Sequence, residues 1–268
     1  LTSGQERIDF DLNIDWKNNI GIGEYKQDIN WRENRRAFTD DRYKLNVMFP
    51  NTLSDSKIYK DAPFDVCESI LEDTYFGTWD SIKHNIILNW VDQLQKDEQY
   101  GLTVLSDHTT SYSYGKDFPL SLTLQYSGIG LWGEDYKITQ ASTMKYALIP
   151  HIGKWDRANI HTQSTCWNEP LIASLHQHID LFDKSFLRLD RVGYELTSAK
   201  FENEKILFRV FNAEGDASSC KISFGFPVSE IDLNGNVIEE KIVSKSNTIS
   251  ISMPRFGFKT YMVSKYPY

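Results

Sequence analysis

Long apolar runs are missing from this 268-residue sequence, and its 29 basic residues are outnumbered by 37 acidic ones. Without a run of roughly 18 apolar residues, no segment is predicted to cross a membrane as a helix. The formal net charge is −8, and an acidic surface repels a phosphate backbone, which argues against a nucleic-acid partner. No basic amphipathic segment is present either, so we expect no contact with a membrane surface.

Cysteine is scarce, and its three positions are Cys67, Cys166 and Cys220. Their wide spacing fits neither a disulfide framework nor a CxxC metal site. Each lies in an apolar stretch, which predicts three buried, reduced thiols that behave as small hydrophobic side chains. The number and spacing of the cysteines therefore do not show whether the protein works in a reducing or an oxidising compartment.

The short motifs of several enzyme classes are absent as well. The sequence contains no P-loop, no dinucleotide-binding glycine fingerprint, no GxSxG elbow and no HExxH helix. It has no initiator methionine and begins directly in a strand-like pattern, so we interpret it as a piece of a longer polypeptide or as a processed chain. Localisation is therefore unknown; we expect a soluble protein, and a bacterial periplasmic or secreted location would fit.

Aromatic residues and alternating patterns dominate what is present. The 36 aromatic residues (7 Trp, 14 Tyr and 15 Phe) favour strands over helices. Between residues 120 and 126, Leu or Tyr alternates with Ser, Thr or Gln, which is the pattern of a half-buried strand. Residues 8–16 show the same period of two. The sequence therefore predicts an all-β protein.

Two domains are expected. Residues 1–184 are predicted to form a large antiparallel β-sandwich, in which the segment 54–70 is a strand broken by a proline, with Phe64 and Val66 facing the core. Residues 185–268 contain short strands about 8–12 residues apart, which is typical of a small sandwich. The boundary is placed near residue 184, at the end of a linker.

Candidate binding residues follow strand-like segments. Asp107 and His108 end one of them, where a carboxylate could orient sugar hydroxyls or could cap the following turn through backbone N–H groups. His176 and His178 could begin a metal site on one side of a strand, or could face solvent in a linker. Both pairs of alternatives stay open, and no third metal ligand can be assigned.

Aromatic side chains gather in the central part of the chain. Exposed rings stack on sugar faces, but the same residues also build β-sandwich cores. Tyr112 and Tyr114 alternate with serines and share one face, and the sequence does not decide whether that face is wet. The carboxylates of Asp117, Glu134 and Asp135 lie nearby; a glycosidase needs two at a defined separation, which spacing along strands cannot establish.

Several motifs occur in a fixed order over residues 6–171. They are RIDFDLNIDW (7–16), YKLNVMFP (43–50), NWVD (89–92), YGLTVLSD (100–107), LSLTLQYS (120–127), MKYALIPHIGKW (144–155) and NEPL (168–171). In this order they resemble the C-terminal β region of the bacterial-type α-mannosidases of glycoside hydrolase family 38. The sequence departs from the family at Gln125-Tyr126-Ser127, where many relatives have an Arg-Ser pair, and at Lys154, where the family has aspartate.

This resemblance implies a large sandwich of the galactose mutarotase-like supersandwich type, followed by a small C-terminal β-sandwich. Members of the family are retaining exo-mannosidases whose aspartate nucleophile and zinc ligands belong to an N-terminal β/α domain. No motif here matches those residues. The resemblance therefore implies that this chain alone has no catalytic residue, no metal ligand and no cofactor, with zinc expected in the missing catalytic domain.

In the family, some side chains of the large sandwich reach the shared active site. If this holds here, Asp107, His108, Gln125 and Tyr126 line the substrate site. The implied partners are the N-terminal catalytic domain of the same polypeptide and an α-mannoside carbohydrate.

Three functional hypotheses follow. The chain is the C-terminal, non-catalytic part of an α-mannosidase-like hydrolase, which stabilises the catalytic domain and lines its site. Alternatively, it is a stand-alone carbohydrate-binding β-sandwich, or a purely structural domain. A structural domain predicts an exposed apolar patch, through which the isolated chain could form a homodimer.

Overall fold

The structure is a computed structural model that describes residues 4–16, 44–70, 82–126, 138–173, 175, 185, 187–214, 219–224, 227–239 and 248–263. This part of the chain contains one helix and strands that form four antiparallel sheets. The prediction of a mostly β protein is therefore confirmed for the described residues. No helix in these ranges is long and apolar enough to span a membrane.

The chain divides into two compact units, residues 1–158 and 159–268. The boundary expected from the sequence, near residue 184, lies outside the described residues. The one described helix, which begins just after residue 159, belongs to the second unit.

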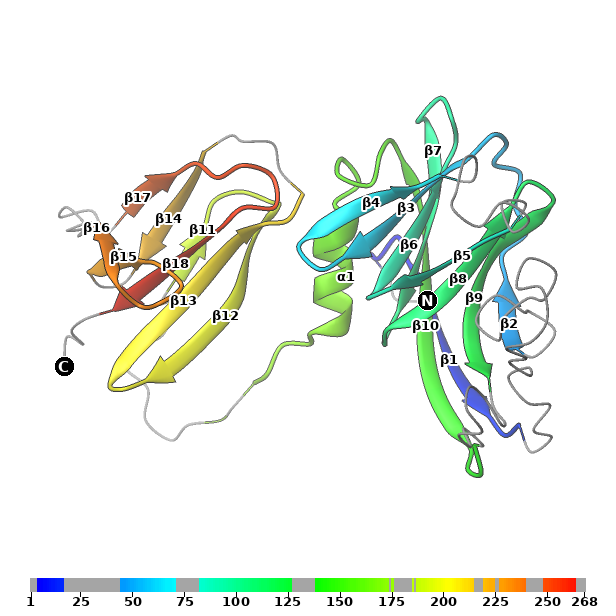
Figure 1. The fold of residues 1–268 in the computed structure, drawn as a ribbon, viewed down its shortest axis with the longest axis horizontal. Coiled ribbons are helices and arrows are strands. Elements are labelled where there is room, and N and C mark those ends of the chain that lie inside the picture. Colours follow the sequence, from blue (N-terminus) through cyan, green and yellow to red (C-terminus); the bar gives the residue numbers. More distant parts are fainter. Residues whose placement is uncertain are drawn as a thin grey trace, which may run out of the picture. The chain divides into compact units, whose positions relative to one another are not determined.

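Two antiparallel sheets make up the first unit (Figure 1). The six-stranded sheet contains, in spatial order, β1 (Ile8–Ile14), β10 (Ser142–Ile152), β7 (Tyr100–Ser106), β6 (Trp90–Leu94), β3 (Lys57–Ala62) and β4 (Asp65–Ser69). The four-stranded sheet contains β2 (Lys44–Met48), β9 (Phe118–Tyr126), β8 (Thr110–Gly115) and β5 (Ile82–Ile87). The chain passes from one sheet to the other between β7 and β8.

One cluster of buried side chains lies between these two sheets. Both sheets contribute aliphatic and aromatic residues to it, namely Ile58, Val91, Val104 and Tyr146 from the first and Ile87, Tyr112, Tyr114, Leu120 and Leu122 from the second. Phe10 stacks on the Tyr146 ring with the centroids 4.6 Å apart. Removing this apolar surface from water is the dominant stabilising term of the unit.

Strand β9 is buried on both faces, instead of half-buried as predicted. Tyr112 and Tyr114 of the neighbouring β8 face the core. The opposite, polar face is also shielded from solvent, with Ser111 and Thr123 almost fully buried. The hydroxyl of Ser111 donates to Thr123 Oγ1 at 2.9 Å. Such cross-strand hydrogen bonds allow small hydroxyl side chains to be buried without a large desolvation cost.

A proline is tolerated inside the long strand β10 because of where its neighbour ends. Pro150 has no N–H and pairs with Leu102 of β7. On the other side, β1 pairs with β10 only as far as Leu148. At residue 150 the strand therefore has a partner on one side only, so the missing N–H does not interrupt the β1 ladder.

Two predictions about side-chain burial are wrong. Phe64 lies in the turn between β3 and β4 with a φ of 57° and is exposed, because the segment 54–70 forms a hairpin and not one interrupted strand. Cys166 is exposed, Cys67 is half-buried and only Cys220 is buried; all three are free thiols.

The second unit contains two further sheets. The three-stranded sheet contains β11 (Leu187–Leu189), β14 (Cys220–Phe224) and β17 (Thr248–Ile251). The five-stranded sheet contains β12 (Tyr194–Glu202), β13 (Lys205–Asn212), β18 (Phe258–Val263), β15 (Val228–Ile231) and β16 (Val237–Glu239). They enclose a separate core, which includes Phe208, Val210, Ile222, Phe224 and Tyr261.

Helix α1 (Ile160–Asn168) is capped from a distant part of the chain. Asn159, which precedes the helix, has a left-handed φ of 54° and makes no side-chain capping bond. Instead, Glu214 accepts the backbone N–H of Thr162 on Oε1 at 3.1 Å. A carboxylate at this end satisfies free N–H groups and complements the helix dipole. The sequence analysis missed this helix because its capping residue stands 52 positions away.

Burial shifts the ionisation of the groups around this cap. Desolvation raises the pKa of Glu214 to about 7, although hydrogen bonds from residues 161 and 162 oppose the shift. Desolvation also raises the pKa of Glu195, whose Oε2 lies 3.6 Å from His161 Nε2. Desolvation lowers the pKa of His161 to about 4. At neutral pH, His161 is therefore uncharged and Glu214 is partly protonated.

Replacing Glu214 by Gln is expected to change how stability depends on pH. The folded-state pKa of Glu214, about 7, lies above its usual value of 4.5. The folded state therefore holds the extra proton, and the free energy of unfolding falls as pH rises between these two values. Gln still accepts from residue 162 but does not titrate. We therefore subtract the free energy of unfolding of the wild type from that of Glu214→Gln. This difference should increase as the pH rises between the two pKa values, by at most ~1.4 kcal/mol per pH unit.

Urea unfolding followed by circular dichroism, for both proteins at several pH values, measures this difference. The lowered pKa of His161 contributes the opposite slope, but it does so in both proteins and cancels. A difference that stays constant from pH 4.5 to pH 7 would show that Glu214 ionises normally.

Candidate functional site

Asp107 and His108 lie in the connection that carries the chain from β7 to β8. Asp107 Oδ1 is 2.6 Å from His108 Nδ1, and its Oδ2 accepts the backbone N–H of Lys145 at 3.0 Å. The side chains are 33% and 40% exposed, respectively. The carboxylate thus holds a backbone N–H of β10 and orients the imidazole, whereas in the following turn the backbone N–H of His108 donates to Ser106 Oγ at 3.4 Å. Contact with a sugar stays a prediction.

Gln125 belongs to the same end of the first unit. It lies near the end of β9, which is antiparallel to β8, so it is close to the end of β8 that follows Asp107 and His108. Its Oε1 accepts the hydroxyl of Ser142 at 3.2 Å. Its Nε2 is buried and has no hydrogen-bond partner among the described residues. A buried amide donor without a partner carries a desolvation cost.

Other predicted positions cannot be placed. The side chain of Tyr126 lies outside the described part of the structure. The same holds for several aromatic, acidic and histidine candidates, namely Trp132, Glu134, Asp135, Tyr136, His176 and His178. Within the described ranges, no group of three or more His, Cys, Asp or Glu side chains is arranged to hold a metal ion.

Residues of three sequence motifs meet in the six-stranded sheet of the first unit. Asp92 of β6 is fully buried. Its Oδ1 accepts the hydroxyl of Thr103 at 3.0 Å and lies 2.8 Å from His151 Nε2. The other ring nitrogen, Nδ1, lies 3.0 Å from the carbonyl oxygen of Gly153. Both ring nitrogens of His151 therefore face oxygen atoms, and hydrogen bonds fix the ring on both sides.

Gly101 makes this contact possible. It stands directly opposite His151 in the register of β7 and β10, and the imidazole crosses it to reach Asp92 on the next strand. A Cβ atom at residue 101 would lie 2.3 Å from His151 Cε1 and 2.5 Å from Nε2. Since hydrogen bonds hold the ring at both nitrogens, only glycine leaves the space that it needs.

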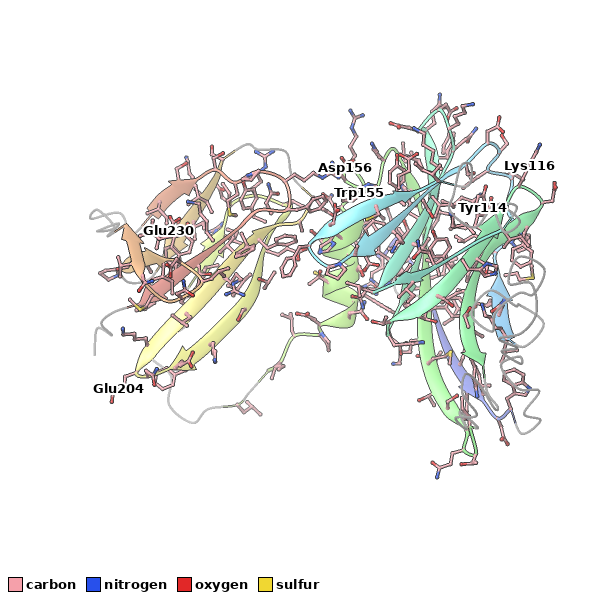
Figure 2. All side chains as sticks on the ribbon, in the orientation of Figure 1. Tyr114, Lys116, Trp155, Asp156, Glu204 and Glu230 are labelled. Carbon is pink, nitrogen blue, oxygen red and sulfur yellow. The ribbon has the colours of Figure 1, made fainter. Side chains whose placement is uncertain are left out.

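The same motifs supply two buried indoles. The ring centroids of Trp90 and Trp155 are 5.7 Å apart, and both side chains are almost completely buried; Figure 2 labels Trp155. Lys154, which stands where the related motif has aspartate, places Nζ 5.3 Å from the centroid of the Tyr59 ring. This distance is typical of a cation–π contact.

Sequence reasoning identified these motifs but not the contact between them. Asp92 and His151 are 59 residues apart, and only the pairing of β6, β7 and β10 brings them together. Along the chain, Trp90 stands close to Asp92, and His151 stands close to Trp155. This proximity was the available sign in the sequence that the two motifs meet in the fold.

A cavity of about 280 Å³ lies at the other end of β8 and β9. Asp107, His108 and Gln125 do not line it. Asp117, Tyr114 and Phe118 do, and the sequence analysis had considered the first two only as members of larger sets.

The described residues thus define a β-sandwich protein with a buried polar contact in one sheet and partly exposed polar groups at one end. No family model and no curated protein matches the sequence. Among solved structures, an α-mannosidase from Enterococcus faecalis V583 has a similar fold, with a TM-score of 0.63 and 16% identity over 82% of this chain. A protein in glycosyl hydrolase family 38 from Enterococcus faecalis matches with a TM-score of 0.61 and 17% identity over 82% of this chain.

These matches confirm, at the level of the fold, the resemblance to bacterial family 38 α-mannosidases. The chain covers only 26% of each solved chain. It therefore spans about a quarter of the length of the proteins that it resembles.

Replacing Gly101 by Ala is expected to destabilise the first unit by roughly 3 kcal/mol, because the added methyl group overlaps a ring that cannot move away. In a His151→Ala background the ring is absent. There the same substitution should be nearly neutral, since Ala is conformationally less costly than Gly in a strand. Urea unfolding of the four proteins gives the coupling free energy, expected to be ~2–3 kcal/mol. An equal cost in both backgrounds would exclude the proposed role of Gly101.

Proposed function

We propose that this chain is the C-terminal, non-catalytic part of an α-mannosidase-like glycoside hydrolase, in which it stabilises the catalytic domain and lines its site. The observation that carries the proposal is the fold match over 82% of the chain to one region of an α-mannosidase. The order of the sequence motifs points to the same family. The parent enzyme would hydrolyse terminal α-mannosides with retention of configuration, through a glycosyl-enzyme intermediate.

In this proposal the first unit corresponds to the galactose mutarotase-like supersandwich of the family, and the second to its small C-terminal β-sandwich. The zinc ion and the aspartate nucleophile would come from the N-terminal catalytic domain. Asp107, His108 and Gln125 would face the substrate site, together with Tyr126 at the end of β9. The partial exposure of the first two supports this assignment.

An exposed apolar segment supports an interface with another domain. Leu171, Ile172 and Leu175 follow α1 and are essentially fully exposed. Three large aliphatic side chains this close together in solvent mark an interaction surface. We assign this segment to the contact with the catalytic domain of the same polypeptide. Self-association of the isolated chain through it stays a prediction.

The isolated chain is expected to show no hydrolysis of aryl α-mannosides, with or without added zinc, because the catalytic machinery would reside in the missing domain. Release of the aryl leaving group, followed by absorbance with purified chain, measures this. A matched preparation of a family 38 α-mannosidase serves as the positive control. Zinc-dependent turnover by the purified chain would refute the proposal.

The exposed segment gives a second expectation. In a longer polypeptide that carries the catalytic domain, the backbone amides of residues 171–175 should exchange more slowly than in the isolated chain, because an interface shields them. Hydrogen exchange followed by mass spectrometry compares the two. The turn at residues 232–236, between β15 and β16, is the internal control. Equal exchange of residues 171–175 in both forms would place the interface elsewhere.

A further inference from the structure

The cavity at the turn between β8 and β9 has both apolar and polar walls. One wall is the loop after β2, and the other is the turn itself. Its lining residues are Phe49, Pro50, Asn51, Leu53, Gln93, Tyr114, Gly115, Lys116, Asp117, Phe118 and Pro119. Figure 2 labels Tyr114, near the end of β8, and Lys116, in the turn that follows.

Hydrogen bonds fix the floor and the loop of this cavity. Asn51 Nδ2 donates to Gln93 Oε1 at 2.9 Å, and Gln93 Nε2 donates to Ser56 Oγ at 3.0 Å. The backbone N–H of Leu53 donates to Asn51 Oδ1 at 3.0 Å. The backbone N–H of Phe49 donates to the carbonyl of residue 120 at 2.8 Å. The loop is therefore tied to β6 and β9, and the cavity is formed before any ligand arrives.

The rim carries charged groups that are free to bind. Lys116 and Asp117 are both exposed, and neither has a hydrogen bond or an ion pair within the described part of the chain. Beside them, Phe118 is half-buried. A carboxylate accepts strong hydrogen bonds from hydroxyl groups. The half-buried Phe118 ring and the adjacent prolines offer apolar surface, so the lining suits a ligand with a hydroxylated edge and an apolar C–H face.

We infer that this cavity is a carbohydrate-binding subsite that holds one neutral pyranose ring. The volume of about 280 Å³ lies near the lower limit of small-molecule sites, which restricts the occupant to a single ring. Lys116 and Asp117 contribute opposite charges, so the cavity favours a neutral hydroxylated ligand over a phosphate or a carboxylate. The inference goes beyond the proposed function, because the cavity lies at the end of β8 remote from Asp107 and His108.

Nuclear magnetic resonance titration of the isolated chain with methyl α-mannoside, methyl β-glucoside and methyl β-galactoside tests the inference. At least one sugar should shift the amide signals of residues 115–117 and of residue 53 in a saturable way. The dissociation constant should be on the order of a few millimolar, as for a small ligand with few contacts.

Asp117→Asn is expected to weaken this binding by about fivefold or more, because a charge-assisted acceptor is lost. Asp97→Asn is the matched control, since Asp97 is also an exposed hairpin aspartate but does not line the cavity. It should leave binding unchanged. Dispersed spectra of both variants show that they remain folded.

Two results would overturn the inference. One is the absence of saturable shifts with all three glycosides. The other is a set of shifts that Asp117→Asn leaves unaltered, including shifts centred on residues 107, 108 and 125. This second result would place sugar binding at the other end of the first unit, where the proposed function expects it. The cavity inference would then be wrong while the proposed function still held. Neither result depends on the hydrolysis assay.

Discussion

The first unit depends on the buried contact between Asp92 and His151. An unpaired charge at either position would carry a large desolvation penalty, so each residue is tolerated only because the other is present. The imidazole crosses Gly101, and the contact therefore joins β6, β7 and β10 in a single register. A slip of one residue in this register would turn the side chains of a strand to the opposite face. The pair thus contributes specificity of strand pairing as well as stability.

This register also sets the geometry at the proposed substrate-facing end. Strand β10 presents Lys145, whose backbone N–H binds Asp107, and Ser142, whose hydroxyl binds Gln125. The polar groups at this end are consequently held by the strand that the buried pair aligns.

In the second unit, Glu214 has a comparable role for α1. It supplies from a distant loop the acceptor that the residue before the helix does not provide.

Alternation of apolar and polar residues correctly predicted the strands at residues 8–16 and 120–126, which are β1 and β9, because it reflects the two faces of a pleated sheet. The same reasoning failed where burial is set by partners remote in sequence. The hydroxyl-rich face of β9 is buried, and Ser111 of β8 satisfies the hydroxyl of Thr123 there. Phe64 is exposed because the chain reverses at that residue, although its apolar side chain favoured the core. Cys166 is exposed on a helix that no local capping signal announces.

The sequence by itself determined the β class, the approximate positions of the strands and the order of motifs that resembles an α-mannosidase region. These properties depend on neighbouring residues, and short-range patterns record them. Only the tertiary structure decided that Asp92 and His151 meet across Gly101 and that Glu214 caps α1. It also decided that Asn51 and Gln93 build one wall of a cavity. Each of these contacts joins residues more than 40 positions apart in the chain, and the packing of strands, loops and a helix that creates them leaves no local trace in the sequence.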